Sequence, residues 1–146
     1  GSNDGIFKGM PVVTEQGLVG SIDAVTASAA RVKLITDQSS VVNVKLQMSK
    51  TEAQVQGSIT GDITLEMVNP SVQLTEGDLV FTSGLGGSFP PEIFIGQVLT
   101  PQIKENALFQ TANIQSSVDF QNLRAVLVIT NFRSVDIAPL VPTPIQ

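Results

Sequence analysis

Short apolar runs that alternate with polar residues are the feature that most constrains the fold of this chain. Residues 42–46 and 63–67 alternate strictly between apolar and polar side chains. Side chains of a β-strand point to the two faces of a sheet in turn, so each segment predicts a strand with one buried face. Turn-forming residues recur roughly every 8–12 residues, which is typical of a β-sandwich or barrel. The pattern therefore predicts an all-β chain.

About ten segments have the length and composition of strands. They are Met10–Thr14, Leu18–Val25, Arg31–Thr36, Val42–Leu46, Val55–Thr60, Ile63–Met67, Leu79–Thr82, Ile93–Leu99, Leu108–Ile114 and Leu123–Thr130. A short connection ending in Gly17 joins the first two, and this predicts a β-hairpin. One short helix is predicted at Lys50–Gln54, because Ser49 and Glu52 have the spacing of a capping box.

Two similar segments place a glycine inside a predicted strand, directly after an apolar pair. One is Leu18-Val19-Gly20 and the other is Phe94-Ile95-Gly96. A glycine inside a strand often marks a β-bulge or a sharp bend at the corner of a barrel. The similarity suggests that the two halves of the chain are two related small barrels.

The composition excludes several classes of function. Only 14% of the 146 residues are charged, against roughly 25% in an average soluble domain, and the net charge is −5. Without a basic cluster, nucleic acid is not an expected partner. The sequence contains neither Trp nor Tyr, and this argues against an aromatic platform for sugars or bases. No stretch reaches the roughly 20 apolar residues of a membrane-spanning helix.

The glycine-rich stretch from Gly77 to Pro91 is the one segment that looks like a catalytic or phosphate-binding loop. Its turn-forming residues are Gly77, Asp78, Ser83, Gly84, Gly86 and Gly87. A phosphate-binding loop needs a lysine or a helix after its glycines, but here Ser88-Phe89-Pro90-Pro91 follows and stops any helix. We therefore expect a tight turn, with glycines supplying positive φ angles.

No catalytic site is expected. The chain has no His and no Cys, so it lacks the usual base and the thiol nucleophile. A Ser–Lys pair formed by Ser83 or Ser88 would remain, but no spacing supports it. The lysines available for such a pair are Lys8, Lys33, Lys45, Lys50 and Lys104. The frame around Thr82 resembles an aspartic protease loop, but Thr82 stands where the catalytic Asp would be.

No metal or cofactor is expected either. The available oxygen ligands are carboxylates without the spacing of a calcium loop. The four considered are Asp62, Glu66, Glu76 and Asp78. Three of them are expected to be solvated surface charges, and Asp78 is expected to form an Asx-type turn at the entry to a strand.

An apolar segment follows the glycine-rich stretch and is the candidate partner-binding surface. Its residues are Phe89, Pro90, Pro91, Ile93 and Phe94. The competing interpretation is a lid that packs on the barrel's own core. The sequence leaves both interpretations open.

Three groups of residues together resemble the MreC family of rod shape-determining proteins. The first is Val12-Val13-Thr14 with Gly17-Leu18-Val19-Gly20 and Val32–Asp37. The second is Gly77–Gly87 with Phe89-Pro90 and Ile95–Val98. The third is Leu108-Phe109 with Val118–Phe120 and Leu123–Ile129. The resemblance runs in the family's order from about Gly5 to Phe132.

The resemblance implies a fold of two small β-barrels, with a trypsin-like double-barrel topology and without an active site. The first barrel would be incomplete at its N-terminus. It would occupy residues 1–52, the second barrel residues 53–133, and a Pro-rich extended tail residues 134–146. The sequence leaves open whether Gly1 and Ser2 are native, and the resemblance implies a membrane anchor and a coiled coil before the barrels.

The resemblance also implies a structural role on the extracytoplasmic side of the membrane, in a protein anchored by one membrane helix. Its partners would be MreD, RodA, penicillin-binding protein 2, the MreB machinery and further copies of itself. Two alternatives stay open: a degenerate serine-hydrolase-like double barrel and a cell-wall-binding module. The chain departs from the family at Glu92, where a glycine usually follows Phe-Pro-x, and we expect a different backbone there. It also lacks a basic residue often found near Gly57–Gly61.

Overall fold

The computed structural model describes residues 1–102, 107–132 and 134. In this part of the chain the regular structure is ten β-strands and three single-turn 3₁₀ helices. The first sheet contains β1 (Pro11–Thr14), β2 (Gly17–Val25), β3 (Ala30–Leu34) and β10 (Leu127–Val128). The second contains β4 (Val41–Leu46), β5 (Glu52–Gly57), β6 (Ile63–Val68), β7 (Leu79–Thr82), β8 (Phe94–Gln102) and β9 (Gln110–Ser116). The 3₁₀ helices are η1 (Ser2–Asp4), η2 (Leu85–Gly87) and η3 (Phe120–Asn122).

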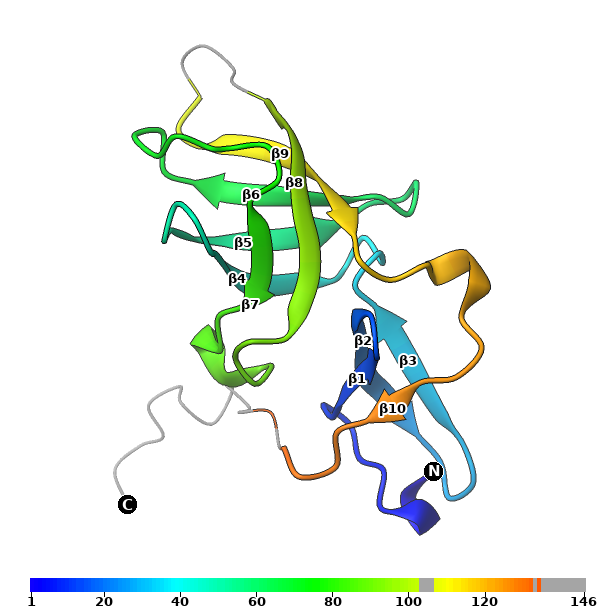
Figure 1. Ribbon diagram of the computed structural model, residues 1–146. Coiled ribbons are helices and arrows are strands. Elements are labelled where there is room, and N and C mark those ends of the chain that lie inside the picture. The colour runs from blue at the N-terminus through cyan, green and yellow to red at the C-terminus, as the bar shows by residue number, and fades with distance from the viewer. Residues whose placement is uncertain (103–106, 133, 135–146) are drawn as a thin grey trace, which may run out of the picture.

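The second sheet closes into a six-stranded antiparallel barrel in the order β4-β5-β6-β9-β8-β7. β4 pairs with β7 to close it, with Val44 opposite Thr82 and Leu46 opposite Val80. Alternate side chains point inward, as in Val42, Val44 and Leu46, which are all fully buried. The all-β prediction is therefore confirmed, including one closed barrel (Figure 1).

The first sheet is open, and this corrects the prediction of two barrels. Its order is β10-β1-β2-β3, so β3 and β10 form its two edges. Four strands are too few to curl round and close with a core inside. β10 comes from the far end of the chain and pairs with β1 through Val12 and Val128 (Figure 1).

The sheets do not divide at residue 52. β4 precedes that position but belongs to the barrel, and β10 lies after it but belongs to the open sheet. Membership of a sheet does not by itself define a domain boundary, so the predicted boundary at 52/53 stays a prediction. The predicted Pro-rich tail at 134–146 lies outside the described residues except for Ser134.

The helix predicted at Lys50–Gln54 is wrong. Lys50 has a left-handed φ of 59°, which ends any helical run, and β5 begins at Glu52. The buried Oγ of Ser49 makes no hydrogen bond, so it caps nothing. Ala53 and Val55 instead alternate into the barrel core.

The glycines inside two strands lie at β-bulges, as predicted. In the first sheet Val12 pairs with Gly20 and Val13 with Leu18, so Val19 is the extra residue. In the barrel Val80 pairs with Gly96 and Phe81 with Phe94, and Ile95 is extra. Both extra residues are buried, at 1% and 0% exposure. Each bulge thus turns an additional apolar side chain into a core.

The open sheet packs on the barrel through shared apolar residues. Leu18 of β2 and Ile35, which follows β3, belong to the barrel's buried core. Phe120 of η3 packs against both that core and the core of the open sheet. No helix among the described residues is long and apolar enough to cross a membrane.

Candidate functional site

The glycine-rich loop leaves the barrel at the end of β7 and returns to it at β8. Gly84, Gly86 and Gly87 have φ angles of 81°, 77° and 71°. These are left-handed values that L side chains rarely adopt, so the glycines allow the chain to reverse here. The side-chain amide of Asn43 on β4 donates to the Leu85 carbonyl at 3.1 Å and holds the loop against the barrel.

Thr82 organises the second half of this loop from the barrel interior. Its side chain is fully buried. The Oγ1 hydroxyl donates to the Pro90 carbonyl at 2.7 Å and accepts from the Ile93 amide at 2.8 Å. The position that would carry a catalytic Asp in an aspartic protease therefore carries a structural hydroxyl. Sequence reasoning did not identify this role, although a polar residue at the buried end of an apolar strand was the available signal.

Ser83 lies in a turn and is not part of a catalytic pair. Its Oγ accepts a hydrogen bond from the Leu85 amide at 3.1 Å, and its own amide donates to the Asn43 carbonyl. Among the described residues no lysine or carboxylate hydrogen-bonds to Ser83. The serine-hydrolase alternative required such a group, and the arrangement around Ser83 does not meet that requirement.

Asp78 is buried and connects two distant turns. Its carboxylate oxygens accept from the amides of Met48 at 2.7 Å and Ser49 at 3.1 Å, in the β4–β5 turn. Gly77 before it has φ 90° and donates its amide to the Val98 carbonyl. The expected local Asx turn is therefore replaced by a contact across about 30 residues of sequence. The described residues contain no group of three or more His, Cys, Asp or Glu side chains that would hold a metal.

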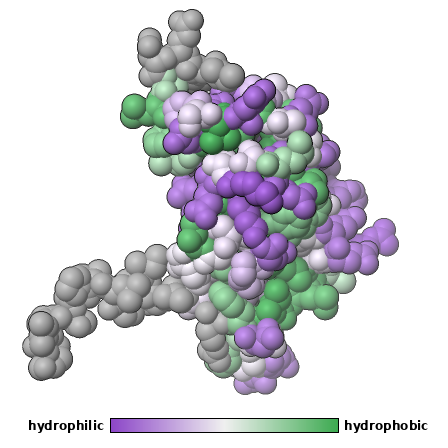
Figure 2. Space-filling view, turned by 60° about the vertical axis from the view of Figure 1, so that its left-hand side comes forward, coloured by the Kyte–Doolittle hydropathy of each residue, from purple (hydrophilic) through white to green (hydrophobic). Residues whose placement is uncertain are grey.

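The Phe89–Phe94 segment is part lid and part surface. Phe89 and Ile93 are half-buried and pack against the barrel core. Phe94 instead lies against Phe81, with the ring centroids 5.2 Å apart and the planes tilted by 44°. Pro91 is exposed, and Leu85 in the preceding turn is 50% exposed. The face in Figure 2 shows hydrophobic residues reaching the surface in patches separated by hydrophilic ones.

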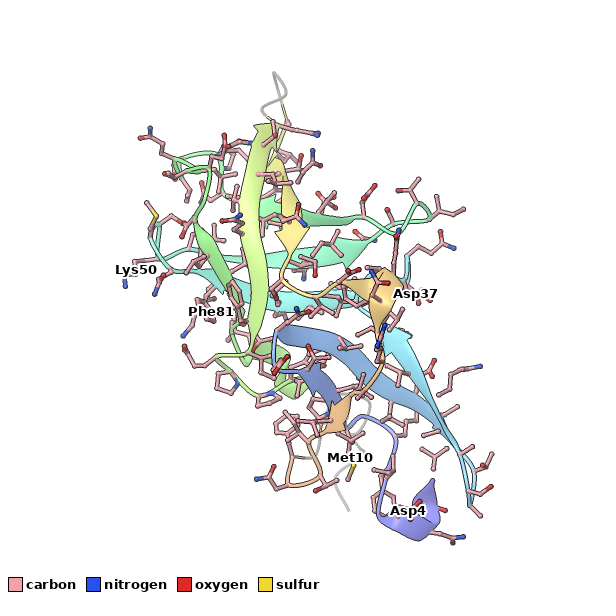
Figure 3. The ribbon with its side chains drawn as sticks, turned by 45° about the vertical axis from the view of Figure 1, so that its right-hand side comes forward. Asp4, Met10, Asp37, Lys50 and Phe81 are labelled. Atoms are coloured by element: carbon pink, nitrogen blue, oxygen red, sulfur yellow. The ribbon has the colours of Figure 1, made fainter. Side chains whose placement is uncertain are left out.

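Glu92 adopts a left-handed backbone conformation, which is rare for a residue with a side chain. Its φ is 71°, and the expected difference from the family's backbone at this position stays a prediction. Its carboxylate forms an ion pair with Lys45 on β4. The two side chains also line a pocket of about 320 Å³ together with Phe81 and Lys50. Lys50 and Phe81 lie on the same side of the barrel in Figure 3.

Two carboxyl groups in β2 and in the β3–β4 connection have a lowered pKa. Hydrogen bonds from the Arg31 guanidinium lower the pKa of Asp23. The amide and hydroxyl of Ser39 lower the pKa of Asp37, because both donate to its carboxylate. Neither of these two carboxyl groups lies in the glycine-rich loop.

The barrel, its glycine-rich loop and the open sheet agree with one protein family. Residues 1–130 match the family model described as the barrel core of the rod shape-determining protein MreC. The chain belongs to the MreC family. The resemblance noted in the sequence is thereby confirmed.

Relatives with curated names support the same family. The cell shape-determining protein MreC of Listeria monocytogenes is 33% identical over 134 residues, which cover 88% of this chain and 45% of the relative. MreC of Escherichia coli is 26% identical over 147 residues, covering 100% of this chain and 40% of the relative. The chain thus spans less than half the length of these MreC proteins.

Solved MreC structures have the same fold. MreC from Pseudomonas aeruginosa superposes with a TM-score of 0.82 at 30% identity, covering 88% of this chain and 84% of that one. MreC from Listeria monocytogenes superposes with a TM-score of 0.82 at 33% identity, covering 93% of this chain and 66% of that one. MreC in a complex with PBP2 from Helicobacter pylori superposes with a TM-score of 0.68 at 18% identity, covering 81% of this chain and 74% of that one. At this identity the likeness shows the fold alone.

Proposed function

We propose that this chain is the barrel core of a non-catalytic scaffold that controls rod cell shape by organising and activating peptidoglycan synthases. The observation that carries the proposal is the match of residues 1–130 to the MreC barrel core. The names of the curated relatives, cell shape-determining proteins, support it. The loop geometry agrees with this role, because the hydroxyl groups of Thr82 and Ser83 form hydrogen bonds with the backbone of the loop.

The proposed location is the extracytoplasmic side of the cell membrane, in a longer protein with a single membrane anchor. A solved relative described as the major periplasmic domain of the cell shape-determining filament MreC supports this, with a TM-score of 0.71 at 23% identity. The expected relation to trypsin-like double barrels belongs to the same proposal and concerns topology alone.

The proposed partners are a penicillin-binding protein 2 transpeptidase, RodA, MreD, the MreB machinery and other copies of the chain. The Helicobacter pylori complex of PBP2 with MreC supports the first of these. The other partners rest on family membership.

The proposed partner surface is the exposed part of the glycine-rich loop and the segment after it. Leu85 and Pro91 are exposed there and Phe94 is partly exposed, while Phe89 and Ile93 hold the segment on the barrel core. Pro90 is fixed by its bond to Thr82. A surface that is already rigid loses little conformational entropy on binding, which favours association.

Co-purification of the full-length protein with a PBP2-type transpeptidase tests this surface. A Leu85→Glu/Phe94→Glu double variant places charges on it, and we expect recovery of the transpeptidase to fall sharply. Ile59→Glu is the matched control, because Ile59 is 86% exposed in the β5–β6 turn and lies outside the surface. Circular dichroism must show that both variants keep the parent β-sheet signal. Undiminished recovery with the folded double variant contradicts the proposed surface.

A further inference from the structure

A polar groove of about 880 Å³ lies where the barrel meets the open sheet. Its walls come from the β1–β2 turn, the β3–β4 connection, the β5–β6 turn, β9 and the segment leading into η3. The β5–β6 turn and the β9–η3 segment lie on the same side of the molecule in Figure 1. The volume is within the range of about 300–1,000 Å³ that is usual for ligand sites. None of the lining residues belongs to the glycine-rich loop.

Neutral hydrogen-bonding side chains are the largest class in the lining, at ten of eighteen residues, and five of the others are apolar. Thr64 of β6, Asn113 and Gln115 of β9 and Gln121 of η3 contribute hydroxyl and amide groups. No lysine or arginine lines the groove, so a phosphate or another anion would find no counter-charge there. The groove therefore suits an uncharged ligand with many hydroxyl or amide groups.

Two acidic residues line the groove, but their carboxylates are already engaged locally. Asp119 accepts from the Gln121 amide at 3.2 Å and from the side-chain amide of Asn122 at 2.7 Å. Asp62 accepts from Thr60, whose hydroxyl is also 2.9 Å from that of Ser58. These bonds shape the two turns, and they make the carboxylates poor candidates for holding a cation.

The side-chain amides of Asn113 and Gln121 are among the lining groups available to a ligand. Neither makes a hydrogen bond to any described residue, although Asn113 is half-buried on β9. Polar groups in such positions are normally satisfied by a protein group, water or a ligand. An amide can donate and accept at once, so these two lining residues, one on β9 and one on η3, can each bind a sugar hydroxyl.

An extended peptide is the less favoured occupant. Peptides commonly bind by adding a strand to a free sheet edge. The strands that line the groove, β6, β8 and β9, have both edges paired within the closed barrel. Recognition in this groove must therefore come from side chains.

We propose that this groove binds a neutral oligosaccharide through Asn113, Gln121 and the hydroxyl groups around them. The site is separate from the partner surface proposed above and does not depend on it. Phe120 also lines the groove and offers apolar area to the face of a sugar ring. With a single half-buried phenylalanine and no Trp or Tyr, the affinity is expected to be low.

NMR titration of the folded chain with chitohexaose, and separately with cellohexaose, tests the proposal. We expect saturable shifts of the backbone amides of Asn113, Gln115 and Gln121 with at least one sugar. The two sugars distinguish recognition of N-acetyl groups from recognition of hydroxyls alone. No shifts up to the solubility limit of either sugar, or shifts confined to other parts of the surface, overturn the proposal.

Side-chain variants provide the second readout. Gln121→Ala removes an exposed amide from η3, and we expect about tenfold weaker binding, the factor for one lost hydrogen bond. Asn113→Ala should act in the same direction. Gln97→Ala is the matched control, because it removes an exposed glutamine of β8 outside the groove. If Asn113→Ala fails to fold, Gln121→Ala alone decides. Undiminished sugar binding by folded Gln121→Ala, or saturable shifts from a neutral peptide in place of a sugar, also overturns the proposal.

Discussion

The buried hydroxyl of Thr82 donates a hydrogen bond to the carbonyl oxygen of Pro90, with the two oxygens 2.7 Å apart. The same hydroxyl accepts from the Ile93 amide at 2.8 Å. One side chain at the end of β7 therefore fixes both the Pro-Pro turn and the start of the return to β8. The shape of the loop is thus determined from inside the barrel.

Replacing Thr82 by valine, which has nearly the same shape, tests this role. Thr82→Val leaves the Pro90 carbonyl and the Ile93 amide without their partner, so we expect a loss of about 1–3 kcal/mol in the free energy of unfolding. Urea denaturation followed by circular dichroism measures it. Thr100→Val on β8 is the control, because Thr100 is exposed and its hydroxyl makes no bond to a described residue. Equal stability of the two variants would exclude the proposed role.

Asp78 supports a second prediction, because its buried carboxylate holds the amides of Met48 and Ser49. Asp78→Ala leaves both amides without an acceptor in a partly buried turn, and we expect a cost of about 2–3 kcal/mol. Asp78→Asn keeps one acceptor oxygen and should cost less. Glu76→Ala removes an exposed carboxylate two residues away and should change little. Chemical denaturation of all three variants ranks their losses in the free energy of unfolding. A loss for Asp78→Ala no larger than that for Glu76→Ala would refute the proposed role of the Asp78 carboxylate.

Strand positions were predictable because they follow local patterns. β7 begins and ends at the predicted residues, Leu79 and Thr82, and the bulges lie beside Gly20 and Gly96. Closure of the sheets was not predictable, since it depends on pairs far apart in sequence. Val12 of β1 pairs with Val128 of β10, and no local signal in either segment specifies that partner.

The side chains that form the candidate sites were predicted less well, for the same reason. The sequence indicates that Phe89 and Phe94 lie near a turn, but it does not tell which of them packs inward. Asn113 and Gln121 become neighbours of one groove only when β9 and η3 are placed in space. Glu92 could not be predicted for a different reason. Its φ is left-handed, and residues of its type rarely adopt that conformation.

The bulge at Gly96 leads to a third prediction. A Cβ atom at this position would lie 2.0 Å from the carbonyl oxygen of Gln115 on β9, and the space is closed by backbone. Gly96→Ala must therefore separate β8 from β9, and we expect a cost of about 3 kcal/mol or more, the upper end for overpacking.

Gly61→Ala is the control for this variant, because a Cβ atom at Gly61 meets nothing within 4 Å and the φ there is +84°. It should lose only about 1–2 kcal/mol through its left-handed backbone. Thermal unfolding compares the two, and a Gly96→Ala protein as stable as Gly61→Ala would show that the strands can separate at little cost.

The fourth prediction concerns acid stability through Asp37. Its pKa in the folded chain is below the ordinary 3.8, first because of the Ser39 amide and second because of the Ser39 hydroxyl. A lowered pKa in the folded state means that the interaction is fully present above the pKa of the unfolded chain. It is lost as the pH falls through the lower, folded value. NMR titration of the Asp37 carboxyl should give a midpoint below 3.8. Ser39→Ala keeps the amide and removes the hydroxyl, so it should raise that midpoint part of the way, whereas an unchanged midpoint would remove the hydroxyl as a cause.

The last prediction isolates the backbone conformation of Glu92, which has a φ of 71° and an ion pair with Lys45. Glu92→Ala and Glu92→Gly both remove this exposed pair, which contributes about 0–1 kcal/mol. They differ only in backbone: alanine is strained at a left-handed φ, while glycine adopts it freely. We expect the glycine variant to be more stable than the alanine variant by about 1 kcal/mol. Urea denaturation of the pair measures the difference. At an ordinary extended or helical position the same exchange favours alanine, so an alanine variant that is the more stable one would mean that residue 92 does not adopt the left-handed conformation in solution.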